Sequence, residues 1–461
     1  MTPRIVVIGG GMAGLAAAWA CHRRQLPALV LEASARTGGV VQTHHADGLV
    51  LDGGPDAFLA TKPGAVVLCR ELGLEPDLVP MLPPRGAFIL SRGHFHALPE
   101  GGAFGVPVSA RAFARSRLLS WRGKLRVAME PLVPRASWLA AHDESARTFF
   151  ERRFGVEAAD RIAQPLLGGI HAGRLETLSA RAVLPQLVAM EAAGTSVWLT
   201  LRRQAGRPRP DGVFRTFPDG MGRLPQALTA ALPAGTIRTG ATVTSLEHAA
   251  DGTWVVHAEG LGRLPADIVV LAVPAWRAAP LLAGCAPDAA AICEAVPYVS
   301  SATVLLAYDD SAVPAAPRGS GYVIAERPAD DPVMAVTWVT AKWPGRAPRG
   351  TTLIRVFFGG EGHEATLAAD DETLAGLAHR HLARWWGLRD APRFARAFRW
   401  MRSSPQHVVG HPTRVAHLQA RLDALGGLGV AGSGFRAVGI PDVVADARAE
   451  MDRLITRWQQ R

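Results

Sequence analysis

The first forty residues constrain the fold of this chain more than any other stretch. The short apolar run Ile5 to Ile8 predicts a β-strand, and Gly9 to Gly14 predicts a tight turn into a helix that continues past Ala20. Leu29 to Leu31 predicts a second strand, which ends at Glu32. A strand, a glycine turn, a helix, a second strand and an acid form the βαβ fingerprint of dinucleotide-binding domains.

Each part of this fingerprint has a mechanical role. Gly9 permits the tight turn, Gly11 lets a pyrophosphate approach the backbone, and Gly14 lets the helix pack closely on the strand. The helix N-terminus offers free N–H groups and a partial positive charge to the phosphates. Glu32 can accept hydrogen bonds from the ribose hydroxyls, which argues against a 2′-phosphate. A glycine-rich turn without a nucleotide is the alternative interpretation.

Two further glycine doublets favour FAD over NAD. Gly38-Gly39 follows Glu32 closely, and Gly53-Gly54 precedes Pro55. An NAD site needs no second doublet, whereas a protein that buries FAD uses one to pass along the diphosphate and to turn beneath the flavin. Two ordinary turns are the alternative interpretation of these doublets.

A third glycine-rich turn lies near the C-terminus. The predicted strand Leu428 to Ala431 runs into Gly432-Ser433-Gly434, and a helix is predicted from about Asp442 to Trp458. The N-terminus of that helix could stabilise negative charge on a reduced flavin. Both ends of the chain are therefore predicted to close around the same FAD.

Between these ends, the chain predicts a helical stretch and a second sheet. Helical spacing dominates from Ser109 to about Arg203, and basic side chains interleave with apolar ones over Leu118 to Met129. The basic stretch fits solvated helix faces or, alternatively, a membrane-docking helix. Strands of the second sheet are predicted over Thr303–Tyr308, Gly321–Ala325, Val333–Thr340 and Thr352–Phe358.

Further short elements are predicted from their flanking turns. A hairpin at Asp251-Gly252 is predicted to join strands over 236–247 and 254–259, and the apolar run 267–273 predicts a strand that is buried on both faces. Other predicted elements are a helix over 62–73, a hairpin over 87–98, a loop over Pro99 to Pro107, and a helix over 370–386.

The composition indicates a globular protein of two or three domains. The chain has 461 residues, of which 48% are hydrophobic and 20% are charged. Its net charge of +10 is carried mostly by arginine, and no basic strand with interleaved aromatic residues is visible, so we predict no nucleic-acid binding. A basic protein suits a polycarboxylate ligand or an anionic membrane surface.

The cysteines and histidines predict no metal site. The four cysteines have neither a CxxC pair nor zinc spacing, which favours free thiols in a reducing compartment. His379 and His381 face different sides of a predicted helix, and His407 and His411 lie in a predicted loop. No signal peptide and no membrane-spanning run are expected. We predict a cytoplasmic protein and leave open a peripheral attachment to the inner face of the membrane.

Several blocks of the sequence resemble the oxygen-dependent porphyrinogen oxidases of haem biosynthesis, which are FAD-dependent, amine-oxidase-like flavoproteins. The most specific are Pro-Leu-Leu-Gly-Gly-Ile-His-Ala-Gly from Pro165 and Gly-Ile-Pro-Asp from Gly439. The blocks as a whole are Glu32 to Phe58, Leu98 to Pro107, Asp143 to Leu184, Phe217 to Leu228, Pro405 to His411, and Gly432 to Asp442. They extend over nearly the whole chain.

The resemblance implies an α/β (α+β) fold of the glucose–methanol or amine-oxidase type. A Rossmann-like FAD-binding domain is expected from residues 1–56, 212–285 and 410–461. A mixed-sheet substrate-binding domain is expected from 57–98 and 286–409. The remaining residues, 99–211, are expected to form a helical insertion, which in relatives can dock on membranes.

The resemblance also implies an activity. We expect the removal of six electrons from protoporphyrinogen IX, with FAD as cofactor, molecular oxygen as acceptor and hydrogen peroxide as product. Oxidation of coproporphyrinogen III to coproporphyrin III is the alternative. A flavin amine oxidase or desaturase, a non-catalytic binder, and a haem-pathway scaffold without turnover are further alternatives. A homodimer and a peripheral membrane contact stay open.

The resemblance assigns FAD contacts by motif, and the acidic rim of the implied substrate suggests Arg85 as a binding residue. Arg85, Gly169 and His171 are expected to bind substrate, with Arg85 as a candidate for a bidentate propionate contact. No catalytic side chain is assigned. FAD is expected to contact Gly9, Gly11, Met12, Ala13, Gly14, Glu32, Ala33, Gly39, Val40, Gly54, Pro55, Asp56, Ala57, Val243, Trp400, Ser433, Val438, Gly439 and Ile440.

Five positions depart from the pattern of the family near the expected flavin and substrate. His171 stands where relatives usually show tyrosine, and Ala437 replaces a glycine. Ser403-Ser404 and His407 stand in place of the more common Ala-Met and Tyr. Substrate identity is therefore less firmly predicted than the fold.

Overall fold

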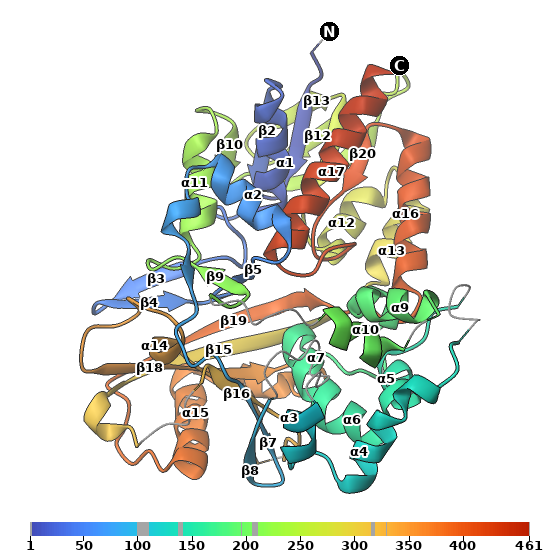
Figure 1. Cartoon of the computed structure of the whole chain (residues 1–461). Helices are drawn as coiled ribbons and strands as arrows, with labels where there is room; N and C mark the ends of the chain where they lie inside the picture. Colours follow the sequence, from blue (N-terminus) through green and yellow to red (C-terminus); the bar gives the residue numbers. More distant parts are fainter. Residues whose placement is uncertain are drawn as a thin grey trace.

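The computed structural model describes residues 2–98, 110–136, 142–194, 196–204, 211–314, 319–328 and 330–460. The loop predicted over Pro99 to Pro107 lies outside these residues. Figure 1 shows an upper part, which holds both termini, and a lower part with a second sheet and a group of helices beside it. The α/β fold class is confirmed.

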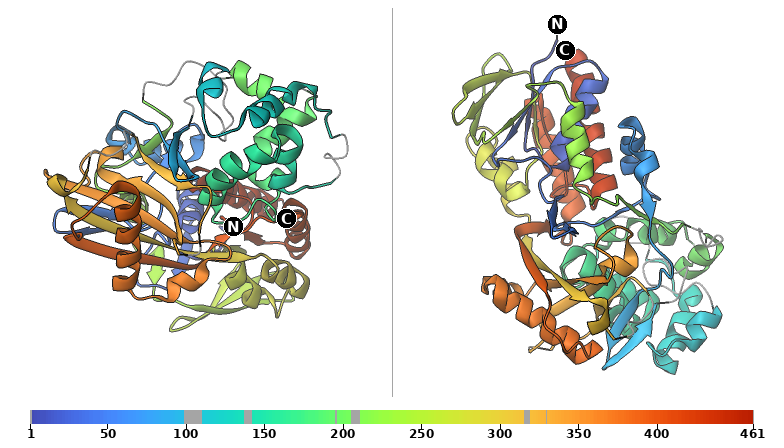
Figure 2. Two further views of the ribbon diagram at one scale, coloured as in Figure 1. Left: turned by 90° about the horizontal axis from the view of Figure 1, so that it is seen from below. Right: turned by 90° about the vertical axis from the view of Figure 1, so that its left-hand side faces the viewer.

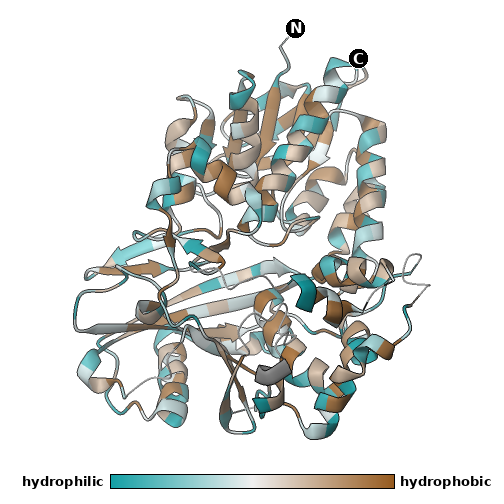
Figure 3. Cartoon of the chain, in the orientation of Figure 1, coloured by the Kyte–Doolittle hydropathy of each residue, from teal (hydrophilic) through white to brown (hydrophobic). Residues whose placement is uncertain are grey.

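A parallel sheet forms the centre of the upper part. All residues of its two middle strands, β1 and β14, are buried, as their apolar, β-branched sequences predict. Figure 3 shows these strands in brown between helices that carry teal outer faces. In spatial order the strands are β10 (Ile237–Thr239), β2 (Ala28–Glu32), β1 (Ile5–Ile8), β14 (Ile268–Leu271) and β20 (Leu428–Val430).

Helices cover both faces of this parallel sheet. The side chains of Ile5 and Val7 pack into one apolar core, and those of Val6 and Ile8 pack into another on the opposite face. The first core is shared with α1 (Met12–Arg23), α2 (Pro63–Glu71), α11 (Arg223–Ala231) and α17 (Ile440–Gln459). The second is shared with α12 (Ala275–Leu282), α13 (Pro287–Glu294), α16 (His411–Leu425) and a small sheet of β11 (Val243–His248), β12 (Trp254–Ala258) and β13 (Gly262–Ala266).

The prediction of one strand over 236–247 is wrong, because the chain forms two strands that belong to different sheets. β10 joins the parallel sheet, and β11 starts the small antiparallel sheet. Gly240 lies between them with a φ of +68°, a conformation that glycine adopts without strain. The hairpin of β11 and β12 around Asp251-Gly252 is confirmed.

A seven-stranded mixed sheet forms the lower part. The four strands predicted in the second half and the hairpin over 87–98 are confirmed, whereas the long edge strand β19 was not predicted. In spatial order the strands are β19 (Phe394–Pro405), β15 (Tyr298–Asp309), β18 (Thr351–Gly359), β17 (Val333–Trp338), β16 (Gly321–Ile324), β7 (Phe88–Ser91) and β8 (His94–Ala97). Helix α15 (Asp371–Trp386) packs on one face of this sheet, with Asp370 as its N-cap.

Two short sheets lie outside these large ones. The hairpin of β3 (Thr43–Ala46) and β4 (Leu49–Asp52) leads into the second glycine doublet. The other short sheet contains β5 (Phe58–Leu59), β9 (Phe214–Thr216) and β6 (Val79–Pro80).

The predicted helical stretch forms a bundle beside the lower sheet. Ser145 caps α5 (Ala146–Phe154), and Gly155 ends it with a φ of +91°, as predicted from these two residues. The other helices are α3 (Ala110–Arg115), α4 (Trp121–Ala128), α6 (Val156–Ala158), α7 (Gln164–His171), α8 (Ala180–Val183), α9 (Pro185–Ala192) and α10 (Val197–Gln204).

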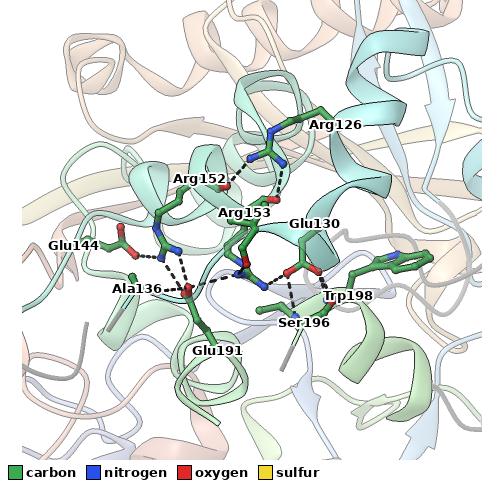
Figure 4. A network of polar contacts seen from close by, with 11 residues as sticks. Arg126, Glu130, Ala136, Glu144, Arg152, Arg153, Glu191, Ser196 and Trp198 are labelled. Carbon is green, nitrogen blue, oxygen red and sulfur yellow. Dashed lines mark hydrogen bonds and ion pairs between the residues drawn. The ribbon is translucent and has the colours of Figure 1, made fainter. Parts of the chain in front are cut away.

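A buried network of charges joins these helices. Figure 4 shows Arg152 and Arg153 of α5 between the carboxylates of Glu130, Glu144 and Glu191. The Arg152 guanidinium lies 2.6 Å from Glu144 and 2.5 Å from Glu191. Glu130 binds Arg153 and also accepts hydrogen bonds from the backbone at the start of α10. The bundle is therefore held by ion pairs as well as by apolar contacts.

The strands of each large sheet come from the segments that were predicted for the two main domains. By packing, however, α2 and α13 belong to the cores of the upper part, although they were assigned to the substrate-binding segments. We therefore propose the predicted boundaries with one change: 63–71 and 287–294 join the FAD-binding domain.

The two ends of the chain lie side by side. Helix α17 packs on α1, and Figures 1 and 2 show the N- and C-termini close together at one end of the molecule. Among the described residues, no helix is both long enough and apolar enough to cross a membrane.

Candidate functional site

The first glycine turn has the shape that a diphosphate requires. The Gly9 N–H donates to the Leu31 carbonyl at 2.8 Å, and a Cβ at Gly14 would lie 1.8 Å from the Gly9 carbonyl oxygen. A Cβ at Gly11, in contrast, would meet no atom closer than 4.0 Å. Gly9 and Gly14 are thus fixed by the protein, and Gly11 leaves free space at the N-terminus of α1, where no side chain caps the helix.

Glu32 lies at the end of β2, beside this turn. Its carboxylate accepts hydrogen bonds from the Gly10 N–H at 2.6 Å and from the Ser34 N–H at 2.8 Å. The Glu32 carbonyl accepts from the Ala241 N–H at 2.9 Å, which brings the chain before Val243 next to the acid. The structure therefore gathers Glu32, Ala33 and Val243, three residues assigned to FAD from distant motifs.

The Gly38-Gly39 doublet stacks on the first turn. The Gly38 N–H donates to the Gly10 carbonyl at 2.8 Å, and a Cβ at Gly39 would lie 3.3 Å from the Gly11 Cα. A Cβ at Gly54 would lie 1.8 Å from the Val40 carbonyl oxygen. Close backbone packing thus joins the first turn to both doublets, through Gly39 and Val40.

The Gly53-Gly54 doublet is held by side chains of the lower sheet. The Gly53 carbonyl accepts from Thr303 Oγ1 at 3.0 Å and from Trp400 Nε1 at 2.9 Å. Arg355 Nη2 donates to the same carbonyl at 3.1 Å and to the Gly54 carbonyl at 2.5 Å. The backbone before Pro55 is therefore fixed from below by three donors.

Buried charges continue this support to Asp56. Its carboxylate lies 2.9 Å from Lys342 Nζ and 2.8 Å from Trp343 Nε1. Burial raises the pKa of Asp56, but Lys342 and Arg355 lower it more strongly, so the net pKa lies well below its usual range. Asp56 therefore stays ionised and fixes the backbone from Pro55 to Ala57.

A second ion pair lies under the same doublet. Arg346 Nη1 lies 2.8 Å from the Asp52 carboxylate, and both side chains are buried. Asp52 also accepts a hydrogen bond from the Met221 N–H at 2.9 Å. Burial raises the pKa of Asp52, and the Arg346 charge opposes this. The pair ties the end of β4 to the lower part of the molecule.

The C-terminal glycine turn closes on the first one. A Cβ at Gly432 would lie 3.3 Å from the Ala13 Cβ, and Met12, Ala13 and Ile440 share one core. Gly439 has a φ of +82° and precedes α17. The sequence motifs of both chain ends, including Ser433 and Val438, therefore meet near the N-terminus of α1.

Two histidines hold this C-terminal loop and were not predicted to do so. His407 Nε2 lies 2.8 Å from the Ser433 carbonyl oxygen, and His411 Nε2 lies 2.7 Å from that of Phe435. The two imidazoles stack with ring centroids 4.1 Å apart. The prediction that His411 lies in a loop is wrong, because it is the first residue of α16. The helical spacing of Val415, Leu418 and Leu422 was the signal for this helix.

The three expected substrate residues lie on different elements. Gly169 is on α7, where a Cβ would lie 3.5 Å from Val323 Cγ1 of the sheet. His171 ends α7, and its carbonyl accepts from Gln406 Nε2 at 2.9 Å. Arg85 precedes β7 and donates from Nε to the Met81 carbonyl at 2.8 Å. Among the described contacts, none joins Arg85 to Gly169 or His171.

These observations fit FAD. The first turn leaves room at Gly11 and holds the Glu32 carboxylate beside it, and the C-terminal glycine loop closes over the same helix N-terminus. Arg355, Thr303 and Lys342, which support the second doublet, were missed. An arginine in the middle of an otherwise apolar strand, 351–359, was the only signal for one of them. No group of three metal-binding side chains is present among the described residues.

Comparisons with known proteins agree with this geometry. Residues 12–455 match the family of flavin containing amine oxidoreductases. The coproporphyrinogen III oxidase of Bacillus subtilis (strain 168) is 31% identical over 98% of both chains. That of Propionibacterium freudenreichii subsp. freudenreichii is 33% identical over 98% of this chain and 90% of its own. The crystal structure of a provisionally named protoporphyrinogen oxidase from Exiguobacterium sp. 255-15 aligns over 100% of both chains, with 29% identity and a TM-score of 0.86.

Proposed function

The chain belongs to the FAD-dependent porphyrinogen oxidases within the family of flavin containing amine oxidoreductases, and we propose that its substrate is coproporphyrinogen III. Its activity is therefore that of an oxidoreductase on a porphyrinogen, with FAD as cofactor. The sequence analysis placed protoporphyrinogen IX first and coproporphyrinogen III second. We reverse this order.

One observation carries the choice of coproporphyrinogen III. The chain matches coproporphyrinogen III oxidases from two bacteria almost end to end, at 31% and 33% identity. The charge of the chain is in accord with this choice. Coproporphyrinogen III has four propionates, whereas protoporphyrinogen IX has two, and a net charge of +10 attracts the more acidic substrate more strongly.

We infer the following roles for the residues around the cofactor. When bound, FAD supplies the hydride acceptor for the oxidation of the macrocycle. The backbone N–H groups of Gly11, Met12 and Ala13 bind the diphosphate, and Glu32 binds the ribose. Gly54 to Ala57 form a rigid wall beside the isoalloxazine ring. The other proposed FAD contacts are Gly9, Gly14, Ala33, Gly39, Val40, Val243, Trp400, Ser433, Val438, Gly439 and Ile440.

We propose that His171 accepts a hydrogen bond from a pyrrole N–H. Burial, with a smaller effect from His407, lowers the pKa of His171 to about 4, so the imidazole is neutral near pH 7. A neutral imidazole keeps one nitrogen free to accept a hydrogen bond. Gly169 lies two residues earlier on α7 and therefore on a different face of the helix, and we propose that its lack of a side chain lets a flat ligand approach the backbone there.

We propose that Arg85 binds a propionate. Arg85 Nε donates a hydrogen bond to the Met81 carbonyl, and no described residue accepts a hydrogen bond from the terminal amino groups of Arg85. A carboxylate can therefore bind there in a bidentate manner. We expect Arg85→Ala to raise the KM for coproporphyrinogen III about tenfold, which corresponds to about 1.4 kcal/mol. Unchanged substrate affinity in this variant would reject the assignment.

The central experiment is anaerobic bleaching of the bound flavin. Coproporphyrinogen III should bleach it at least about tenfold faster per unit concentration than protoporphyrinogen IX, a preference of about 1.4 kcal/mol. A primary amine should leave the flavin oxidised and so serves as the control for an amine oxidase. Faster bleaching by protoporphyrinogen IX would make it the preferred substrate. Bleaching by the amine would refute both porphyrinogen assignments.

We further propose that molecular oxygen is the electron acceptor. Admission of oxygen to the bleached protein should restore the flavin colour and release hydrogen peroxide. A flavin that stays reduced in air, but is reoxidised by a quinone, would refute this proposal.

We also propose a peripheral contact with anionic membranes through α4 and the turn that follows it. Trp121 is 69% exposed and Leu132 is 77% exposed, and both lie close in sequence to exposed basic residues. The Arg122 guanidinium lies 5.4 Å from the centre of the Trp121 indole ring. An apolar face with adjacent cations suits an anionic interface. Co-sedimentation with anionic vesicles should fall in Trp121→Ser, and no binding of the unaltered protein would refute the contact.

A further inference from the structure

A buried chain of three hydrogen-bonded side chains lies between the lower sheet and α15. The Tyr322 hydroxyl lies 2.8 Å from His381 Nε2. His381 Nδ1 lies 2.8 and 2.7 Å from the two carboxylate oxygens of Asp331. All three residues are buried. None of them belongs to the FAD or substrate assignments, so this chain needs another explanation.

The Asp331 carboxylate fixes the direction of one of these hydrogen bonds. An ionised carboxylate can only accept, so His381 Nδ1 carries the proton. Burial raises the pKa of Asp331, but His381, together with hydrogen bonds from Trp385 and the Val333 backbone, lowers it, and the net pKa lies below its usual value. In the neutral imidazole with its proton on Nδ1, His381 Nε2 is an acceptor, and the Tyr322 hydroxyl donates to it. The Tyr322 phenol is thus hydrogen-bonded to a base, His381, which is itself hydrogen-bonded to the Asp331 carboxylate.

Stacked indoles connect this tyrosine to the surface. The Tyr322 and Trp338 rings lie 5.6 Å apart between centroids. Trp338 and Trp386 stack at 4.2 Å with an angle of 8° between their planes. Trp338 is buried, whereas Trp386 is partly exposed. An aromatic path therefore leads from the buried phenol to solvent.

The other two tyrosines of the chain lack this arrangement. Tyr308 lies 3.0 Å from His379 Nδ1, but among the described residues no carboxylate contacts His379. The Tyr298 oxygen accepts a hydrogen bond from the Ala275 N–H at 2.8 Å. Tyr322 alone has an imidazole that is itself bonded to a buried carboxylate. Tyr308 thus provides a matched control on the same sheet and the same helix.

We propose that Tyr322 is a redox-active tyrosine, which gives one electron to an oxidising radical and its phenolic proton to His381. The electron leaves through Trp338 and Trp386 to the radical at the surface, which is reduced by one electron. The O–H bond of Tyr322 breaks and an N–H bond forms at His381 Nε2. The products are a neutral tyrosyl radical and an imidazolium paired with Asp331. Return of one electron and one proton restores the starting state.

The surroundings require the electron and the proton to leave together. Burial raises the pKa of Tyr322 well above 10, so the phenol does not ionise first. Loss of the electron alone would leave an unpaired positive charge on a buried ring, which is costly. His381 avoids both charged forms of the tyrosine, and Asp331 stabilises the imidazolium that results.

The test uses the FAD-loaded protein and azide radicals made by pulse radiolysis. These radicals oxidise exposed tryptophan, and the spectrum then reports transfer of the oxidation from indole to phenol. In the unaltered protein we expect the indolyl signal to decay into a tyrosyl signal. Tyr322→Phe should abolish the tyrosyl signal, and Tyr308→Phe should leave it intact. A tyrosyl signal of full size in Tyr322→Phe would overturn the proposal.

Two further measurements separate a redox role from a structural one. The double variant Tyr298→Phe, Tyr308→Phe keeps only Tyr322 and should still form the tyrosyl radical, which tests the proposal even if Tyr322→Phe does not fold. Heavy water should slow the indole-to-phenol step, and His381→Leu should suppress it while FAD stays bound. Loss of the radical in the double variant, or a step that is indifferent to both heavy water and His381→Leu, would contradict the proposal.

Discussion

The two glycine segments assigned to FAD are built in different ways. The first turn, Gly9 to Gly14, is held by its own backbone: a Cβ at Gly14 would lie 1.8 Å from the Gly9 carbonyl oxygen. The Gly53-Gly54 doublet is held instead by side chains of the lower sheet, through Arg355, Thr303 and Trp400. One segment is self-contained, and the other depends on residues about 300 positions away.

This difference separates steric from electrostatic support. The first turn contains no buried charge and is defined by the absence of side chains. The doublet rests on a buried guanidinium, and the adjacent Asp56 carboxylate is paired with Lys342. Substitutions in the first turn should therefore act by steric clash. Substitutions under the doublet should act by leaving polar groups without partners.

The largest effect is expected from Gly14→Ala. The added methyl group would overlap the Gly9 carbonyl, and such overpacking costs about 3 kcal/mol. We expect a lower melting temperature even without FAD, and no bound FAD after purification. Gly11→Ala is the matched control, because the nearest atom to its methyl group, the Gly39 Cα, lies 4.0 Å away. This variant should leave the melting temperature of the apoprotein unchanged while FAD affinity falls. Equal apoprotein stability for both variants would break the steric half of the comparison.

The next effect is expected from Arg355→Met. The variant keeps an unbranched side chain but leaves the Gly54 carbonyl without its charged donor, which costs about 2 kcal/mol. We expect weaker FAD binding in fluorescence titrations, by about thirtyfold. Arg393→Met, just before β19 of the same sheet, is the control, since its ion pair with Asp309 is half-exposed and contributes little. If both variants bind FAD alike, the buried guanidinium does not support the doublet.

This contrast also decides what could be predicted from the sequence. The first turn, β1, α1 and β2 were predicted correctly because glycine spacing and apolar runs are local signals. The four central strands of the lower sheet were predicted for the same reason. The partners of Gly53 could not be predicted, because a contact across some 250 to 350 residues leaves no trace in a single sequence.

The two main elements that were missed show a second limit. β19 is an edge strand in which Arg396, Arg399 and Arg402 interrupt the apolar residues, so its sequence lacks the apolar run of a central strand. α16 does have apolar helical spacing, but its start at His411-Pro412 resembles a loop. The residue assignments for FAD rested on motifs, and the geometry explains why distant motifs meet.

A loss of folding stability at low pH is expected at the C-terminal glycine loop. This loop is held by histidines and not by either of the two kinds of support compared above. Burial, and to a smaller extent His407, lowers the pKa of His411 to about 3 from 6.5. Between these pH values the unfolded chain binds a proton that the folded chain does not, so stability falls as the pH falls below 6.5. The loss is up to about 1.4 kcal/mol per pH unit. Melting temperatures from pH 7 to 5 should fall less steeply in His411→Gln, and parallel curves would contradict this role.

The smallest effect is expected from Trp400→Phe, which removes one of three donors to the Gly53 carbonyl. The other two, Thr303 and Arg355, remain, so the carbonyl is not left without a partner. The cost should therefore be that of a single hydrogen bond, about 1 kcal/mol, with a weakening of FAD binding of less than about tenfold. Combined with Arg355→Met, the loss should exceed the sum of the two single losses, because donors to one carbonyl are coupled. Strict additivity in FAD titrations would mean that the donors act independently, and the doublet would then not be held as one unit.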